Sequence, residues 1–253
     1  MQTNNHQYNK TQCPCNSNII FGECCGLNPG ADYLEMLDFI KRFNAHGSLY
    51  RVFDNKEYAD KFYDGHIRVS TLEHCRNLEN KLARDKKEGI AVVGIRDLAS
   101  DEKSNENLPH NNTFDSLANP EPAIPIVHLG NNTVKLENAY VICLSTKYNK
   151  YMQTVYGKYC IEISKPAAFF YVLNAVMRNL ELIVDIQPGP IIYDDSVFLN
   201  LKNMTTIMGV GFYKEEKFAK ENEYRVRLLP LLPEIEPVFI EIVNMRNLCK
   251  KVY

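Results

Sequence analysis

The segment from residue 13 to residue 25 reads CPCNSNIIFGECC and holds four of the eight cysteines of the chain. Cys13 and Cys15 form one close pair, and Cys24 and Cys25 form the other. Zinc takes four ligands in a tetrahedron, and a site with four cysteines is a closed structural site with no position open for a substrate. Because so short a segment has no apolar core of its own, the metal would supply its folding free energy. The spacing predicts one structural zinc ion bound by these four cysteines.

The cellular context bears on two other interpretations of the cluster, a disulfide pair and four independent thiols. Residues 1–12 are polar and rich in Asn and Gln, without the apolar segment of a signal peptide. We therefore expect a cytoplasmic protein, and disulfides are rare in that compartment. No apolar run approaches the roughly 20 residues that span a bilayer, so no membrane partner is expected. The remaining cysteines are scattered and are expected to be small core residues: Cys75, Cys143, Cys160 and Cys249.

The cysteine cluster resembles the SEC-C zinc motif, which is best known from the C-terminus of the SecA translocase ATPase. That motif reads Cys-Pro-Cys-Gly-Ser-Gly, then a basic stretch, then Cys-Cys or Cys-His followed by Gly, which here is Gly26. Asn16 and Asn18 stand in place of the two glycines, and Asn enters the left-handed region readily. Residues 19–21, Ile-Ile-Phe, replace the basic stretch. The resemblance implies a zinc knuckle that docks a chaperone, an antitoxin or a translation-associated protein.

Length and composition describe one globular domain with a small appendage. The chain has 253 residues, 45% of them hydrophobic and 24% charged, and a formal net charge of -2. These values are ordinary, and none favours a nucleic-acid or membrane partner for the chain as a whole. The turn at residues 28–30, Asn-Pro-Gly, is interpreted as a linker. We therefore expect a zinc knuckle with a flexible polar N-terminus over residues 1–30, followed by a second domain over residues 31–253.

Hydrophobic spacing in the second domain predicts helices and strands that do not alternate regularly. This order favours an α+β fold over a doubly wound sheet. The charged residues 72–88 and the polar residues 99–122 are interpreted as surface loop or insertion. The first predicted helix begins at Tyr33 and is ended by His46-Gly47, and two others cover residues 55–63 and 165–182. Asp32, Asp54 and Ser164 are the expected caps. The predicted strands cover residues 49–53, 66–70, 139–144, 159–164, 191–193, 207–213, 223–229 and 237–243.

Three separated features of this domain carry groups suited to chemistry on a charged cofactor. Arg51 ends the segment Leu49-Tyr50-Arg51 of the first predicted strand. Ser145-Thr146 stands where a buried strand reaches the surface. Glu221 and Glu223, spaced by one residue, open another predicted strand. An arginine fork can bind phosphate bidentately. A carboxylate can stabilise the positive charge that develops on a ribose when its N-glycosidic bond breaks.

In this order the three features resemble the arginine–serine–glutamate class of ADP-ribosyltransferases, whose pattern is a strand Arg, then Ser-Thr, then Glu-x-Glu. The resemblance implies a mixed two-sheet core with helices and implies NAD as the substrate. Glu223 would hold the ribose hydroxyl, and Glu221 would position or deprotonate the acceptor, which is a protein or a nucleic acid. Arg51 would complete the catalytic set. The residues implied to bind NAD are Arg51, Tyr50, Ser145 and Thr146.

A second pattern runs through the same domain. Its residues are Gly65, Arg76, Glu79, Arg84-Asp85 and Glu88-Gly89, then the segment 156–160, then the Glu-x-Glu-Tyr-Arg strand at 221–225. This pattern resembles a family of uncharacterised bacterial proteins that are often found among phage-defence genes. The resemblance implies an intracellular bacterial protein of toxin or phage-defence type.

Each feature also has an ordinary interpretation. Arg51 alone fits a salt-bridged surface residue, Ser145-Thr146 fits a strand end or helix cap, and the glutamates could continue a solvated helix face over residues 214–220. The sequence has no Gly-Lys-Ser/Thr phosphate loop, nucleophile elbow or kinase signature. Two alternative functions remain. One is a non-catalytic zinc-containing adaptor, and the other is a magnesium-dependent nuclease that uses Glu79, Asp85 and Glu88.

Overall fold

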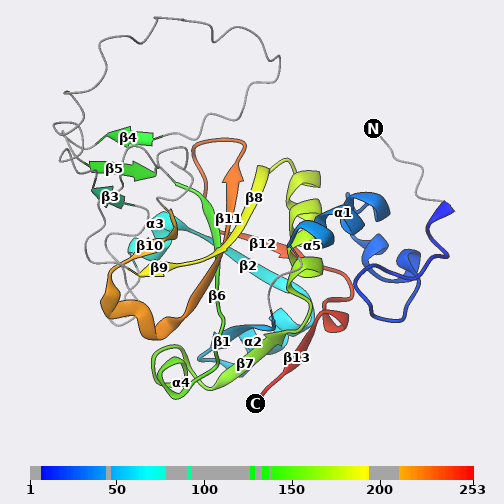
Figure 1. Ribbon diagram of the computed structural model, residues 1–253, viewed down its shortest axis with the longest axis horizontal. Coiled ribbons are helices and arrows are strands. Elements are labelled where there is room, and N and C mark those ends of the chain that lie inside the picture. The colour runs from blue at the N-terminus through cyan, green and yellow to red at the C-terminus, as the bar shows by residue number, and fades with distance from the viewer. Residues whose placement is uncertain are drawn as a thin grey trace, which may run out of the picture.

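Figure 1 shows the computed structural model of the chain, a mixed α+β protein with a large antiparallel sheet and several helices. The structure describes residues 7–43, 47–77, 138–193 and 211–253 in full, and the backbone of residues 90–92, 126–128 and 133–136. The helices are α1 (Tyr33–Phe43), α2 (Lys56–Tyr63), α3 (Leu72–Arg76), α4 (Lys150–Tyr156) and α5 (Pro166–Asn179), with 3-10 turns η2 (Phe21–Glu23), η3 (Cys25–Leu27), η6 (Glu216–Glu221) and η7 (Met245–Asn247). The strands of the large sheet are β1 (Leu49–Phe53), β2 (His66–Thr71), β6 (Tyr140–Ser145), β7 (Tyr159–Ile163), β8 (Ile183–Pro190), β11 (Glu223–Pro230), β12 (Val238–Glu241) and β13 (Cys249–Lys251). Two small sheets pair β9 (Ile192–Tyr193) with β10 (Tyr213–Lys214), and β5 (Thr133–Leu136) with β3 (Ile90–Val92) and β4 (Ile126–His128).

Strand β6 organises the large sheet because three strands pair with it. β11 runs antiparallel along the whole of one edge. On the other edge, β2 pairs at Tyr140 and Val141, and β1 pairs at Ser145 alone. Between these contacts, at residues 142–144, no described strand pairs with this edge of β6. The sheet therefore splits here into a β12–β2 branch and a β1–β7–β13 branch.

Strand β11 has different chemistry on its two faces. Successive side chains of a strand point to opposite sides of the sheet. The apolar face belongs to the main core, where the Tyr224 ring stacks on Phe170 of α5 with the ring centroids 5.8 Å apart. The opposite face is charged and consists of Glu223, Arg225 and Arg227. All three charged side chains are buried, so this face must be neutralised within the protein.

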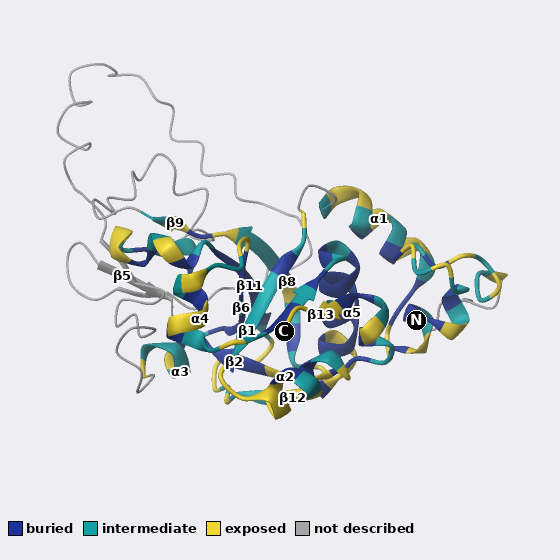
Figure 2. Cartoon of the chain, turned by 90° about the horizontal axis from the view of Figure 1, so that it is seen from below, coloured by how far each residue is buried: buried dark blue, intermediate teal, exposed yellow. Residues whose placement is uncertain are grey.

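Helix α5 is buried on both sides, as Figure 2 shows by its dark colour. Ten of its fourteen residues are buried, which is typical of a helix that packs in the middle of a protein. One side packs on the sheet at β8, and the other contacts α1. The Tyr171 hydroxyl joins the two helices, because it accepts a hydrogen bond from the amide of Asp32 at 2.6 Å and donates one to the Asp32 carbonyl at 2.9 Å.

The segment interpreted as a linker is packed against the second domain. Asn28 is buried, and its side-chain amide makes two hydrogen bonds with the backbone of Val243, at 2.7 and 3.2 Å. Gly30 has a φ of 76°, and a Cβ there would meet the carbonyl of Ala175 in α5. Residues 7–30 therefore form a continuous structure with the domain that follows.

Several predicted elements agree with the structure, and some boundaries differ. The helix predicted from Tyr33 is confirmed as α1, with the Asp32 carboxylate accepting from the amide of Leu34 at 2.9 Å. Residues 44–46, before its predicted end, lie outside the described residues. Helix α2 is capped by Asn55 rather than Asp54. Helix α5 follows Lys165 rather than Ser164, and it ends at Asn179, three residues earlier than predicted.

The sequence analysis missed β8, α4 and β13, and it assigned residues 72–76 to a surface loop although they form α3. β8 contains Pro188, Gly189 and Pro190, a composition that favours a turn. Among the described strands β8 pairs with β11 alone, so it is an edge strand in this part of the structure, where proline is tolerated. The interpretation of residues 99–122 as an insertion lies outside the described residues, as do residues 207–210 of one predicted strand.

Gly157 lets α4 turn directly into β7 beside β1, so replacing it should destabilise the fold. Its φ is 113°, and a Cβ would overlap the backbone of Phe53 and Asp54. We predict that Gly157→Ala lowers the free energy of unfolding by at least about 2 kcal/mol, measured by urea denaturation. Gly47→Ala is the matched control, because a Cβ at Gly47 meets nothing within 4 Å. Equal stabilities of the two variants would contradict this account of the α4–β7 turn.

Candidate functional site

The four N-terminal cysteines converge on one point. Their sulfur atoms all lie within 4.8 Å of one another, and all four residues are buried. The Cys24 sulfur lies 3.6 Å from that of Cys15 and 3.9 Å from that of Cys25. Zinc–sulfur bonds of about 2.3 Å in a tetrahedron place sulfur atoms about 3.8 Å apart. The cluster could therefore form a zinc site, whereas a disulfide needs sulfur atoms about 2.05 Å apart.

The loop around the cluster suits metal ligation. Asn16 and Asn18 both adopt left-handed conformations, with φ of 55° and 62°, as their replacement of glycines in the motif led us to expect. The Ser17 hydroxyl lies 3.1 Å from the Cys24 sulfur, and the Asn247 amide of η7 lies 3.7 Å from it. Hydrogen bonds among the four thiols lower the pKa of Cys15 and Cys24 and raise that of Cys13 and Cys25, so the four groups share their protons. Asn247 also ties the cluster to the second domain.

A second candidate site is a pocket of about 210 Å³ at the split of the large sheet. Its wall is formed by β1, β2, β6, α3, α4 and the segment from β10 to β11. The guanidinium of Arg51 crosses the split and donates a hydrogen bond to the Cys143 carbonyl on the edge of β6 that lacks a strand partner. An arginine side chain thus takes the place of a strand hydrogen bond there. Cys143 and Cys75 were expected in the core, but both are only partly buried and line this pocket.

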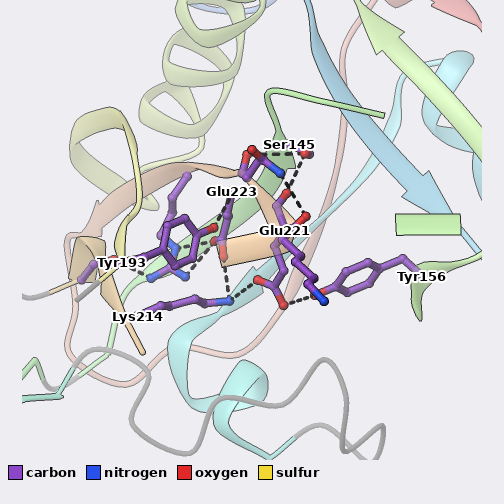
Figure 3. Close-up of polar contacts among 10 residues, drawn as sticks. Ser145, Tyr156, Tyr193, Lys214, Glu221 and Glu223 are labelled. Carbon is purple, nitrogen blue, oxygen red and sulfur yellow. Dashed lines mark hydrogen bonds and ion pairs between the residues drawn. The ribbon is translucent and has the colours of Figure 1, made fainter. Parts of the chain in front are cut away.

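Two carboxylates and one lysine form the charged centre of the pocket, shown in Figure 3. The Lys214 ammonium lies 2.8 Å from the Glu221 carboxylate and 2.7 Å from the Glu223 carboxylate. Tyr156 of α4 donates its hydroxyl proton to the other oxygen of Glu221 at 2.7 Å. Arg225 contacts the other oxygen of Glu223 through Nε at 2.8 Å and Nη2 at 2.7 Å. Both carboxylates are therefore buried and neutralised.

The two carboxyl groups differ in pKa because their partners differ. Burial raises the pKa of Glu223, but the charges of Arg225 and Lys214 outweigh it and lower the value to about 2. Burial also raises the pKa of Glu221, and there Lys214 only partly offsets it, so the net shift is upward. Glu223 is ionised at neutral pH, whereas Glu221 gains a proton more easily. Such a divided pair of carboxyl groups is typical of acid–base sites.

The other side of the pocket carries the positive charges of Arg51 and Arg68. Among the described residues, neither Arg51 nor Arg68 forms an ion pair with a carboxylate. Arg68 lies 3.2 Å from the His74 ring, and burial together with the Arg68 charge lowers the pKa of His74. The hydroxyl of Ser70 is buried in the pocket wall and has no hydrogen-bond partner in the described part of the chain. A buried polar group of this kind suits a ligand.

The structure brings together most of the site residues named from the sequence, but not all of them. Four of them line the same pocket although they come from distant parts of the chain: Tyr50, Arg51, Glu221 and Glu223. Ser145 is fully buried beside the pocket, and its hydroxyl lies 2.7 Å from the backbone carbonyl of Glu221 rather than contacting the Glu223 carboxylate.

Thr146 is the other sequence-named residue that does not line the pocket. It is exposed and contacts the carbonyl of Asn222. Ser145 and Thr146 thus fix the turn between the glutamates, and neither faces the pocket.

Sequence reasoning missed the residues that surround the carboxylates. Lys214 was assigned to a solvated run, but it is only 6% exposed. In the sequence, Lys214 differs from the charged residues that follow it only by its position. It comes before the 3-10 turn η6 and does not lie on a regular helix. Arg68 and Ser70 lie in an ordinary strand pattern, which carries no sign of a pocket, and Tyr156 was named only as part of the segment 156–160. The left-handed Asn222, with φ of 45°, lets the chain turn from η6 into β11, so that both glutamates reach Lys214.

Comparison with known proteins identifies no relative: no family model matches the chain, and neither does any curated protein or solved structure. The resemblances to the SEC-C motif and to ADP-ribosyltransferases thus rest on the residues of this chain alone. In the part of the chain that the structure describes, no helix is long and apolar enough to cross a membrane.

The cysteine cluster predicts one tightly bound zinc ion per chain. We expect Cys24→Ser to weaken zinc affinity by at least about 100-fold, because even the loss of a partner outside the ligand set costs about 10–100-fold. Zinc released by a chelating dye would be measured per mole of protein. Cys160→Ser is the control, since Cys160 is also buried but lies outside the cluster and should retain the metal. Purified protein without zinc, or equal zinc in both variants, would contradict the assignment.

Lys214 should stabilise the fold in a pH-dependent way. The pKa of Glu223 lies below its ordinary value of 4.5, so its stabilising contribution is present above that value and is lost as the pH falls toward 2. Lys214→Met removes a charge that lowers the pKa of both carboxyl groups, so they are easier to protonate in the variant.

We expect this variant to lose about 3–5 kcal/mol of unfolding free energy at about pH 7, and clearly less at about pH 4.5, by urea denaturation. Lys158→Met, at an exposed position, should change little at either pH. A Lys214→Met loss that is the same at both pH values would contradict the charge network.

Proposed function

We propose that the protein is an NAD-dependent ADP-ribosyltransferase of the arginine–serine–glutamate class. The observation that carries this proposal is the convergence of Arg51 from β1 with Glu221 and Glu223 from the start of β11 in one pocket. Arg51 is about 170 positions from the two glutamates in the sequence, and the fold brings all three to the wall of one pocket. The pocket also lies at the split of an antiparallel sheet, where two groups of strands part.

The charge distribution of the pocket supports a substrate with a pyrophosphate group. Both carboxylates are neutralised by Lys214 and Arg225, while Arg51 and Arg68 lack a carboxylate partner among the described residues. Guanidinium groups bind phosphate oxygens in pairs of parallel hydrogen bonds. The pocket thus offers cations for an anionic ligand at one side and carboxylates for a developing cation at the other.

The size of the pocket limits which part of NAD it would hold. At about 210 Å³ it is smaller than typical ligand sites of about 300–1,000 Å³. It would take the nicotinamide riboside portion, with the pyrophosphate near Arg51 and the adenosine outside. Aromatic rings of Tyr50 and Tyr156 in the wall suit a flat nicotinamide ring.

The carboxylates would act on the ribose. Cleavage of the N-glycosidic bond transfers the bonding electron pair to nicotinamide and leaves positive charge on the ribose. Glu223 is ionised at neutral pH, as the stabilisation of that charge requires. A ribose hydroxyl would compete with Lys214 for Glu223. Glu221, whose pKa is raised, would accept the proton of the attacking acceptor group.

The biological setting follows from the two resemblances and is part of the proposal. An intracellular, cytoplasmic bacterial effector of toxin or phage-defence type would modify a protein or nucleic-acid acceptor. The zinc knuckle would dock a chaperone, an antitoxin or a translation-associated partner. The rival adaptor function predicts that the protein works without its carboxylates. The rival nuclease rests on Glu79, Asp85 and Glu88, which lie outside the described residues.

The proposal predicts transfer of label from radiolabelled NAD to a component of cell lysate. We expect Glu223→Gln to reduce this transfer by at least about 100-fold, since the charge that stabilises the transition state is lost. Arg51→Lys should weaken NAD binding, measured calorimetrically, because Lys cannot make the paired hydrogen bonds. Glu241→Gln, at an exposed position of β12, is the matched control and should transfer label like the unmodified protein.

Circular dichroism would verify that Glu223→Gln is folded. If Glu223→Gln does not fold, Arg51→Lys, at a partly exposed position, provides a second test of the enzyme. No label transfer by the unmodified protein, or equal transfer by folded Glu223→Gln, would refute the enzyme. Partner recruitment that survives in Glu223→Gln and Arg51→Lys would favour the adaptor instead.

A further inference from the structure

A stretch beside the pocket is rich in lysine and tyrosine and has no acidic residue. Residues 146–161 contain three lysines and four tyrosines but neither Asp nor Glu, although acids make up 31 of the 253 residues of the chain. The lysines are Lys147, Lys150 and Lys158, and all three are exposed. This stretch forms the turn after β6, helix α4 and the start of β7.

The stretch adjoins the pocket through several contacts. Met152 and Tyr156 of α4 form part of the pocket wall. Tyr148 stacks on Tyr50, which also lines the pocket, with the ring centroids 6.3 Å apart and the planes inclined by 24°. The Tyr148 hydroxyl donates to the carbonyl of Lys158 at 3.1 Å, so the two ends of the stretch lie together. An aromatic pair therefore leads from the pocket toward the lysines.

A fourth lysine joins this group from another part of the chain. The Asn149 amide donates to the carbonyl of Lys220 at 3.4 Å, which holds the start of α4 against the end of η6. We call Lys147, Lys150, Lys158 and Lys220 the basic rim. In the described part of the chain, none of the four forms an ion pair with a carboxylate, whereas nearby Lys217 is paired with Glu215. The rim thus presents uncompensated charge on a chain whose net charge is -2.

We propose that the basic rim and the Tyr50–Tyr148 pair bind single-stranded nucleic acid and lead it to the pocket. Lysines that track a backbone and aromatic rings on which bases stack are the two elements of such sites. A duplex would hide its bases from the tyrosines, and an acidic peptide would need only the charges. This inference rests on the proposed function in one respect: it names the class of acceptor. Binding itself needs no NAD.

The test measures fluorescence anisotropy of a labelled oligothymidylate and a labelled oligouridylate of about twelve nucleotides. If the protein neutralises three phosphates of the single strand, the Kd should rise about twentyfold between about 50 mM and about 200 mM salt. The double change Lys147→Glu with Lys150→Glu should raise the Kd at least about tenfold. The matched control, Lys41→Glu with Lys61→Glu on the exposed faces of α1 and α2, has the same change in net charge and should leave the Kd unchanged.

The aromatic part of the site is tested separately. Tyr148→Ala should raise the Kd about 5–150-fold, the range expected for loss of one stacked base, and Tyr148→Phe should restore binding. No binding at the lower salt concentration would overturn the proposal, and so would an equal loss in the control variant. Equal binding of a duplex, or competition by polyglutamate as strong as by unlabelled oligonucleotide, would show that charge alone acts and would favour a protein acceptor.

These outcomes are separate from those of the enzyme test. Oligonucleotide binding without transfer of label from NAD would support the rim and refute the transferase. Label transfer to protein by a chain that does not bind oligonucleotide would support the transferase and refute the rim as a nucleic-acid site.

Discussion

The divergence of β1 and β2 from one edge of β6 is the constraint on which the site depends. Buried backbone amides and carbonyls must find partners, and a strand edge that loses its neighbour leaves them without one. In this chain Arg51 supplies a donor to the Cys143 carbonyl within the gap. The space that remains between the branches becomes the pocket. Its position follows from strand pairing within the sheet, and most of the described residues of its wall lie on strands and short helices.

The charged face of β11 fits this arrangement. Strand alternation places Glu223, Arg225 and Arg227 opposite the apolar face that packs on α5. Filling that side with apolar residues would stabilise a protein at least as well, because desolvation offsets most of the gain from buried ion pairs. Stability alone therefore does not account for a network that holds one carboxyl group ionised and shifts its neighbour the opposite way.

The sequence could predict features that depend on neighbouring residues. The spacing of Cys13, Cys15, Cys24 and Cys25 suffices for a metal cluster, and the apolar period of residues 33–43 suffices for α1. It could not predict Lys214 as the group between two carboxylates, because burial of a lysine in a run of charges depends on distant strands. Edge strand β8 was missed for a related reason, since its prolines are tolerated where one side of it pairs with no strand that the structure describes. Ser145 was noticed as a surface hydroxyl, but pairing with β1 and β11 buries it.

The cysteine cluster and the pocket belong to one connected structure, and this affects how loss of a metal bound by the cysteines would be interpreted. The four cysteines lie in the same apolar cluster as α5, and α5 supports the sheet that carries Glu223. Asn28 and Asn244 fix the knuckle to the C-terminal part of the chain by hydrogen bonds. Removing zinc would therefore disturb α5 and the sheet as well as any partner surface on the knuckle. A cysteine variant that loses function cannot distinguish an adaptor from an enzyme. Only changes at the split of the sheet, in Arg51 and Glu223, separate the two, because they leave the knuckle intact.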